Sequence, residues 1–413
     1  MSSEQSLFRT QYESLAYPAR DPRDEKKRLI TGSPSHLAEL EHFLFAGRIA
    51  RDRPFRVLTA GGGTGDAAIM LGQQLKDAGI TAEISYLDRS EAARRIAEAR
   101  AQARGLAIRF VAGSLLGPEL EALGLFDYID CGGMLHRLPD PPAGFRALAA
   151  RLAPQGGMGV MVHAGFGRNG IDDLQAILAG LAPADLDLRE RLALAKRLLR
   201  QLPATNRYRR GPMPAKTDLG EDEIFDRFLH AQDRAYRIGA LLDSAAAAGL
   251  RLAGLLEQAR YEPATYLSDP IVRARFASLP DARRWIAGEA IAGCLWRHVV
   301  YLTRADHTAA ALSPSDLDLV PLCRCEDGPT LAQAVGAQQQ LRLTLDGLVY
   351  SLPLPRLAAA ILARIDGQRP ARAIHADLRA GPLPDLAEEE FRADYAALVE
   401  RLAGFNRVLL RRA

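Results

Sequence analysis

The chain has 413 residues, 48% of them hydrophobic and 25% charged, so it can fill substantial cores and is long enough for two or three domains. Its 53 basic and 50 acidic residues leave a net charge of +3, which gives no bulk electrostatic reason to expect nucleic acid or an anionic membrane as a partner. The first residues lack the features of a secretory signal, and no apolar run reaches the ~18 residues of a membrane span, so a cytoplasmic protein is expected.

The four cysteines are too few for a disulfide framework. Cys323 and Cys325 form a C-x-C pair, but no second pair or nearby histidine completes the four ligands of a zinc site. No metal is therefore expected.

Strands and helices are predicted to alternate after the first fifty residues, which contain an amphipathic helix capped by Ser33 or Ser35. Apolar runs followed by helical periodicity predict a mostly parallel sheet of the α/β class, with right-handed crossovers. The expected strands are 55–60, 82–88, 107–114, 126–133 and 157–164, and the expected helices are 65–79, 90–105 and 142–156. Ser90 is the expected cap and Gly105 the expected stop of the second helix.

The stretch "VLTAGGGTGDAAIML", residues 57–71, places a glycine-rich loop between the first strand and the first of these helices. Ligands of parallel sheets bind beyond the carboxyl ends of the strands, which is where this loop lies. A dinucleotide fingerprint requires G-x-G-x-x-G, whereas Gly61, Gly63 and Gly65 are spaced G-x-G-x-G and Asp88 ends the next strand. This spacing favours an adenosyl ligand without a pyrophosphate.

A literal G-x-G-x-x-G occurs at Gly165, Gly167 and Gly170. A helical stretch follows it, and no second strand ending in an acid appears at the distance that the dinucleotide fingerprint needs. We therefore interpret it as a chance match.

Residues ~50–165 resemble a class I S-adenosylmethionine-dependent methyltransferase, because "VLTAGGGTG", "YLD", "VAGS" and "FDYIDCGGMLHRLPDPPAGF" occur in the family's order and spacing. The resemblance implies a Rossmann-like sheet and S-adenosylmethionine as the cofactor. Its expected contacts are Gly61, Gly62, Gly63, Gly65, Asp88, Arg89, Gly113, Ser114, Leu115, Cys131, Gly132, Tyr12 and Thr31.

Two positions depart from the family's pattern. Many members carry an acid two residues before the first glycine, where this chain has Thr59, so the usual contact to the cofactor's ammonium group is in question. Ser114 stands where an acidic residue often binds the adenine amino group, and a serine can still accept that hydrogen bond.

The resemblance also implies catalytic candidates. The loop "CGGMLHRLPDP" would pass near the transferred methyl group, so His136 is a candidate proton acceptor, with structural packing as the alternative. Tyrosines before the first strand form part of a lid over the cofactor in related enzymes. On this basis Tyr17 is a second catalytic candidate and Tyr12 a cofactor contact, with burial beside a helix as the alternative. His36, at the start of the amphipathic helix, is a candidate for substrate binding.

A mainly helical insertion, 171–247, is expected to cover the mouth of the site and to select the substrate. Its run "FLHAQDRAY" is similar to a run in related methyltransferases, which places His230, Asp233, Arg234 and Tyr236 at the cleft. A surface helix with an internal ion pair is the alternative.

The chain is expected to divide into a lid segment, 1–50, a methyltransferase domain, 51–310, and a C-terminal domain, 311–413. "HVVYLTR" is either a late strand of the second domain or pairs outside it. A hairpin at Asp346 and Gly347, two helices, and then a helix and a closing strand are predicted for the last domain. This order resembles a winged helix and the C-terminal modules of bacterial protein-lysine methyltransferases. Protein binding or homodimerisation is expected of it, and nucleic acid is not.

Two functions are compatible with these features. The first is transfer of a methyl group from S-adenosylmethionine to a nitrogen, oxygen or sulfur nucleophile of a small molecule or a protein side chain. The second is a regulatory protein that binds the cofactor without catalysis.

Overall fold

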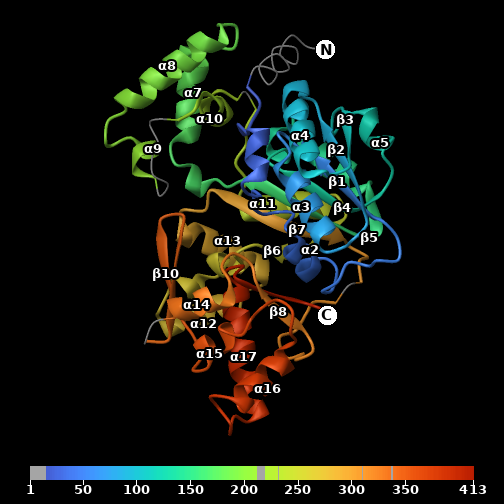
Figure 1. Cartoon of the computed structure of the whole chain (residues 1–413). Coiled ribbons are helices and arrows are strands. Elements are labelled where there is room, and N and C mark those ends of the chain that lie inside the picture. Colours follow the sequence, from blue (N-terminus) through green and yellow to red (C-terminus); the bar gives the residue numbers. More distant parts are fainter. Residues whose placement is uncertain (1–14, 212–218, 231, 309, 336–337) are drawn as a thin grey trace. The chain divides into compact units, whose positions relative to one another are not determined.

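The computed structural model describes residues 15–211, 219–230, 232–308, 310–335 and 338–413, and its elements can be followed in Figure 1. Two compact units are present, and each is discontinuous in the sequence. Unit 1 consists of the described parts of Met1–His36, Arg51–Leu252 and Gly293–His307, and unit 2 of Leu37–Ala50, Ala253–Ala292 and the described parts of Thr308–Ala413. The domain boundaries expected at residues 50 and 310 stay predictions.

A seven-stranded mixed sheet carries unit 1, in the order β3-β2-β1-β4-β5-β7-β6. β1 pairs in parallel with β2 and β4, β2 with β3, and β4 with β5, whereas β7 is antiparallel to β5. The strands are β1 Phe55–Ala60, β2 Ala82–Asp88, β3 Ile108–Ala112, β4 Phe126–Gly132, β5 Leu152–His163, β6 Leu250–Leu255 and β7 Arg297–Arg304. The mostly parallel sheet is thus confirmed, and the run "HVVYLTR" is a strand of this sheet.

The crossover helices begin and end at the signals that the sequence contains. Ser90 caps the helix α4 by accepting a hydrogen bond from the amide of Ala93 at 3.1 Å, and Gly105 ends it in the left-handed conformation. The helices between β1 and β5 are α3 Asp66–Asp77, α4 Glu91–Arg104, α5 Pro118–Glu121 and α6 Pro141–Ala149.

The helix expected over 142–156 is shorter than its prediction. α6 ends at Ala149, and β5 already begins at Leu152, which pairs with Phe126 of β4. Pro154 disfavours a helical conformation at the residue before it, and burial of Leu152 in the sheet favours the strand. The extra strand residues start β5 earlier than the predicted position.

The literal G-x-G-x-x-G after β5 lets backbone segments pack closely. A Cβ on Gly167 would lie 2.4 Å from the backbone nitrogen of Trp296, and one on Gly170 would lie 2.4 Å from that of Tyr208. Gly170 also has a φ of +75°, which glycine adopts without strain. These glycines are therefore required by contacts within the protein.

The insertion after β5 is helical, as expected, and has a small core of its own. Its helices are α7 Ile171–Leu181, α8 Leu188–Gln201, α9 Arg207–Arg210, α10 Glu221–Ile224, a π-helical turn Phe225–Leu229, and α11 Ile238–Ala247. Leu174, Leu199, Ile224 and Phe228 are almost completely buried together. His230 and residues 232–236 are not helical, so the alternative of a surface helix there is wrong.

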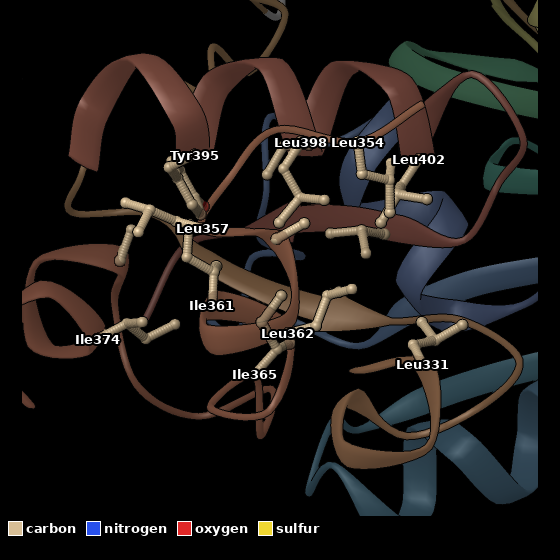
Figure 2. Close-up of a cluster of buried hydrophobic side chains, with 14 of the residues drawn as sticks. Leu331, Leu354, Leu357, Ile361, Leu362, Ile365, Ile374, Tyr395, Leu398 and Leu402 are labelled. Atoms are coloured by element: carbon tan, nitrogen blue, oxygen red, sulfur yellow. The ribbon is translucent and has the colours of Figure 1, made fainter. Parts of the chain in front are cut away.

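Unit 2 contains short sheets and helices around a separate apolar core. Its elements are α2 Leu37–Phe43, α12 Pro270–Ala277, α13 Asp281–Ala292, β8 Val320–Cys323, α14 Gly328–Ala334, β9 Gln340–Leu345, β10 Leu348–Pro353, α15 Ala358–Leu362, α16 Ala371–Ala380, α17 Glu388–Ala403 and β11 Val408–Arg411. Figure 2 shows Tyr395, Leu398 and Leu402 of α17 pointing toward Leu357 and Ile361.

The C-terminal hairpin forms at the predicted turn. β9 and β10 are antiparallel and join at Asp346 and Gly347, which have φ values of +46° and +80°. Two consecutive positive φ values are typical of the type I′ turn that an Asp-Gly pair favours. β11 pairs antiparallel with β8, so the closing strand is also present.

Within the described part of the chain, no helix combines the length and the apolar character that crossing a membrane requires.

A buried ion-pair network ties α4 to the short helix Pro22–Lys26 and to the start of α3. Arg100 is 1% exposed, and its guanidinium contacts the carboxylates of Glu25 and Asp66 at 2.6 Å each, and the carbonyl of Thr64 at 2.8 Å. Arg104 also binds Glu25. The carboxylates of Glu25, which is buried, and Asp66, which is half-buried, are therefore both held by the guanidinium of Arg100.

Replacement of Arg100 by Ala is expected to lower the free energy of unfolding by about 3–5 kcal/mol, because it leaves the Glu25 carboxylate buried with a weakened set of partners. Urea denaturation measures this loss. Arg95→Ala on the same helix removes an exposed pair with Glu91 and should cost less than about 0.5 kcal/mol. Equal effects of the two variants would contradict a special role for the buried network.

Candidate functional site

A cavity of about 780 Å³ lies in unit 1. Residues from the carboxyl ends of β1, β2, β4 and β5 line it, as the binding rule for parallel sheets predicts. The insertion also contributes to its wall. Ten of the predicted cofactor contacts line this cavity: Thr31, Gly61, Gly62, Gly63, Asp88, Arg89, Gly113, Ser114, Leu115 and Gly132.

Side chains from other segments pack directly against the backbone of the glycine loop, in the space that a Cβ atom would need. A Cβ on Gly61 would lie 2.0 Å from Cγ of Met134, and one on Gly62 would lie 2.3 Å from Cε2 of Tyr86. The Tyr86 hydroxyl donates a hydrogen bond to the carbonyl of Gly63 at 2.5 Å. Glycine is thus needed because the loop passes against Met134 and Tyr86, while its other side lines the cavity.

Asp88 holds the loop from the end of β2. Its carboxylate accepts hydrogen bonds from the amide of Gly63 and from the amide of Ser90, both at 2.8 Å. Burial raises the pKa of Asp88, and the two amides oppose that shift. The carboxylate keeps further acceptor sites, since two oxygens offer about four lone-pair directions.

The remaining predicted site residues lie in different places. Tyr17 and His230 line the cavity. Gly65 caps the N-terminus of α3 with a φ of +98°, and Cys131 is buried within β4. Tyr12 lies outside the described residues. The others are not among the residues that line the cavity: His36, His136, Asp233, Arg234 and Tyr236.

His136 and Asp233 do not line the cavity, but both contact a histidine that does, His163. No motif in the sequence had indicated this histidine. His163, the last residue of β5, lines the cavity. Its Nδ1 atom lies 3.1 Å from Oδ1 of Asp233, and its ring centroid lies 4.2 Å from that of His136. Two residues of the predicted site are therefore brought together, through His163.

Arg168 completes this cluster. Its guanidinium donates to Oδ2 of Asp233 at 2.7 Å and approaches Nδ1 of His163 at 2.8 Å. A guanidinium can only donate, and an ionised carboxylate can only accept. Nδ1 of His163 therefore bonds to Asp233 when it carries a proton and to Arg168 when it does not.

Burial and neighbouring charges keep both histidines of the cluster neutral. Burial lowers the pKa of His163, although its hydrogen bond to Asp233 opposes this. Burial and the adjacent His163 and Arg137 lower the pKa of His136 well below its usual value. Burial alone would raise the pKa of Asp233, but the contacts with His163 and Arg168 outweigh it and lower that pKa. Asp233 is thus a stable anion beside neutral imidazoles.

The same three residues have the ligand types of a metal site. The closest donor atoms of His136, His163 and Asp233 all lie within 4.8 Å of one another. The Arg168 guanidinium already supplies a positive charge to Asp233 and contacts His163, so a divalent cation there would meet a like charge. The geometry favours an arginine-neutralised cluster over a metal centre.

The wall of the cavity carries another ion pair. Arg137 from the β4 loop binds Asp226 of the insertion, and both line the cavity. Burial, followed by the charge of Asp226, raises the pKa of Tyr17 to about 12. Burial lowers the pKa of His230 to about 3, so this imidazole is neutral.

The sequence contained a usable signal for one of the residues that it missed. His163 ends a predicted strand, and the carboxyl ends of strands carry ligand contacts in this type of sheet. Arg168 had no local motif to identify it, because its carboxylate partner, Asp233, lies 65 residues away in the sequence.

Comparison with known proteins finds similarity over part of the chain. Residues 58–158 match a family model described as a methyltransferase domain. An uncharacterized protein from Synechococcus sp. is 34% identical over 235 residues, which cover 56% of this chain and 55% of that protein. The chain thus spans about half the length of this curated relative.

The fold is shared with PKMT2 from Rickettsia typhi. One structure of that protein matches with a TM-score of 0.64 and 13% identity, over 91% of this chain and 75% of the other. A second, in complex with AdoHcy, matches with a TM-score of 0.65 and 14% identity, over 92% of this chain and 76% of the other.

Replacement of Gly61 by Ala is expected to lower the free energy of unfolding by about 1–2 kcal/mol or more. The new methyl group would overlap Met134, and an L-residue is strained at a φ of +77°. Thermal or urea unfolding measures the loss. Gly32→Ala is the matched control, since Gly32 also lines the cavity and its Cβ would meet nothing within 4 Å. Two equally stable variants would contradict the close packing of the loop.

Proposed function

We propose that this protein, whose residues 58–158 match a methyltransferase-domain model, is a class I S-adenosylmethionine-dependent methyltransferase that transfers a methyl group to a nucleophile bound in the cavity of unit 1. The nucleophile is a nitrogen, oxygen or sulfur atom of a small molecule or of a protein side chain. One observation carries the proposal: the residues that match the family motifs and a neutral histidine bound to an aspartate line a single cavity.

The residues present fit the cofactor. The Gly61–Gly63 backbone and the carboxylate of Asp88 form one wall of the cavity, where Asp88 would accept hydrogen bonds from the ribose hydroxyls. Gly113, Ser114 and Leu115 follow β3 and would lie along the adenine. The complex of PKMT2 with AdoHcy supports an adenosyl ligand in this fold. S-adenosylmethionine supplies a methyl group that its sulfonium makes electrophilic.

We assign the proton-accepting role to His163. A neutral imidazole on the cavity wall can take the proton that a nucleophile loses, and Asp233 then accepts a hydrogen bond from its Nδ1. His136 packs on the ring of His163 and positions it. Tyr17, with a pKa of about 12, keeps its proton at neutral pH and serves as a hydrogen-bonding group in the cavity.

The insertion is proposed to select the acceptor. Arg191, Asp226 and His230 belong to it and line the cavity. Asp226 is neutralised by Arg137, and His230 is uncharged. The Arg191 guanidinium donates to the carbonyls of Ala182 and Leu229, and although burial lowers its pKa, an arginine keeps its charge at neutral pH. The helices and hairpin of residues 311–413 are proposed to form a winged-helix-like module that binds protein or a second copy of the chain.

Incubation of the protein with S-adenosylmethionine labelled on its methyl group and a cell extract tests the proposal. Label is expected in one acceptor fraction and is expected to disappear with Asp88→Ala, which removes the carboxylate from the cavity wall. Asp77→Ala, at the exposed end of α3, is the control and should retain labelling. Tight binding of the cofactor without transfer to any fraction would instead favour a regulatory protein.

His163→Gln is expected to lower kcat by about 100-fold or more while leaving the Kd for S-adenosylhomocysteine within about threefold of the wild-type value. Because burial lowers the pKa of His163 below its ordinary value, the neutral form prevails at neutral pH, and the rate should fall only when the pH drops below that ordinary value and the imidazole is protonated. Steady-state kinetics over pH 5–9 measure both effects. An unchanged kcat would exclude His163 as the proton acceptor.

A further inference from the structure

Four carboxylates line the cavity among the described residues: Asp66, Asp88, Asp130 and Asp226. Two of them are ion-paired. Asp66 contacts Arg20 and Arg100 at 2.6 Å each, and Asp226 contacts Arg137. Their charges are therefore balanced by the protein itself.

Asp88 and Asp130 have no arginine, lysine or histidine as an ion-pair partner in the described part of the chain. Asp88 instead accepts two backbone hydrogen bonds. Asp130 is 5% exposed and accepts a hydrogen bond from the Ser35 hydroxyl at 2.5 Å. Burial raises the pKa of Asp130 to about 6, since its neighbours replace little of the lost hydration. A cation bound next to Asp130 in the cavity would stabilise the ionised form of this carboxylate.

Strand register places Asp130 beside the base of the glycine loop. Asp130 of β4 is aligned with Thr59 of β1, two residues before Gly61. Aligned residues of neighbouring parallel strands face the same side of a sheet. The hydroxyl of Thr59 is buried without a hydrogen-bond partner among the described residues. A Cβ on Gly132, which lines the cavity, would lie 3.9 Å from both carboxylate oxygens of Asp130.

We propose that Asp130 binds the α-ammonium group of S-adenosylmethionine and so supplies, from β4, the negative charge that Thr59 does not provide on β1. The proposal rests on the proposed function, because that function brings the cofactor into the cavity. It assigns a ligand to a residue that otherwise remains a buried carboxylate without a counter-charge.

The cofactor has two cationic groups, and catalysis distinguishes them. The sulfonium loses its charge when the methyl group leaves, so a carboxylate against it would stabilise the ground state more than the transition state. The ammonium keeps its charge throughout the reaction. Binding through the ammonium therefore holds the cofactor without raising the barrier, which is why we assign this group to Asp130.

The test measures the Kd of the purified full-length protein for three ligands: S-adenosylmethionine, S-adenosylhomocysteine and the deaminated analogue of S-adenosylhomocysteine. Asp130→Asn keeps the shape and the hydrogen bond with Ser35 but removes the charge. This variant should raise the Kd for S-adenosylmethionine and for S-adenosylhomocysteine equally, by about 10- to 100-fold, because one charge-assisted contact is lost. Binding of the deaminated analogue should not change.

Ser35→Gly is the matched control. It removes the hydroxyl that contacts Asp130, keeps the carboxylate, and suits the φ of +85° at this position. The preference for S-adenosylhomocysteine over its deaminated analogue should persist in this variant. Wild-type protein gives a further measurement that does not depend on folding of a variant, since it should bind the deaminated analogue about 10- to 100-fold more weakly.

Three results would overturn the assignment. The first is loss of affinity for S-adenosylmethionine alone, which would place Asp130 at the sulfonium. The second is an equal loss for all three ligands in Asp130→Asn. The third is equal binding of the two homocysteine ligands by the wild-type protein. Failure of the wild-type protein to bind S-adenosylmethionine at all would instead contradict the proposed function.

Discussion

The close packing of Gly61 and Gly62 against Met134 and Tyr86 is the constraint on which the site depends. It joins the end of β1 to the end of β2 and to the loop after β4, so three strand ends form one wall. The hydrogen bond from the Gly63 amide to Asp88 fixes the same loop from its other side. A side chain at Gly61 or Gly62 would push these strand ends apart and change the cavity that they enclose.

Charge balance is the second principle of the site. Arg20 and Arg100 neutralise Asp66, Arg137 neutralises Asp226, and Arg168 neutralises Asp233. These pairs are costly to bury but are stable once every partner is present. The other two carboxylates of the cavity, Asp88 and Asp130, have no ion-pair partner among the described residues and accept only hydrogen bonds. The proposals assign the hydroxyl groups of the cofactor to the first and its ammonium group to the second.

The histidine cluster shows how an insertion completes a site that the sheet only begins. β5 supplies His163 and the segment after it supplies Arg168, but Asp233 comes from within the insertion, between the π-helical turn and α11. The segment that carries Asp233 is anchored to the sheet, since the amide of Tyr236 donates to the carbonyl of His163 at 2.8 Å. The insertion that is expected to select substrates thus also supplies the carboxylate that contacts His163 in the cavity wall.

The sequence by itself determined the mostly parallel sheet, the glycine loop after β1, the position of Asp88 at the end of β2, the two ends of α4 and the hairpin at Asp346 and Gly347. Each of these depends on local periodicity, caps or turn chemistry, and local signals are visible in a linear chain. The end of α6 was mispredicted because pairing of Leu152 with Phe126 decided it. Only the tertiary structure brought Asp130 into register with Thr59 and joined His163 to Asp233. Strand register and contacts between distant segments depend on packing of the whole unit, so no local pattern could reveal them.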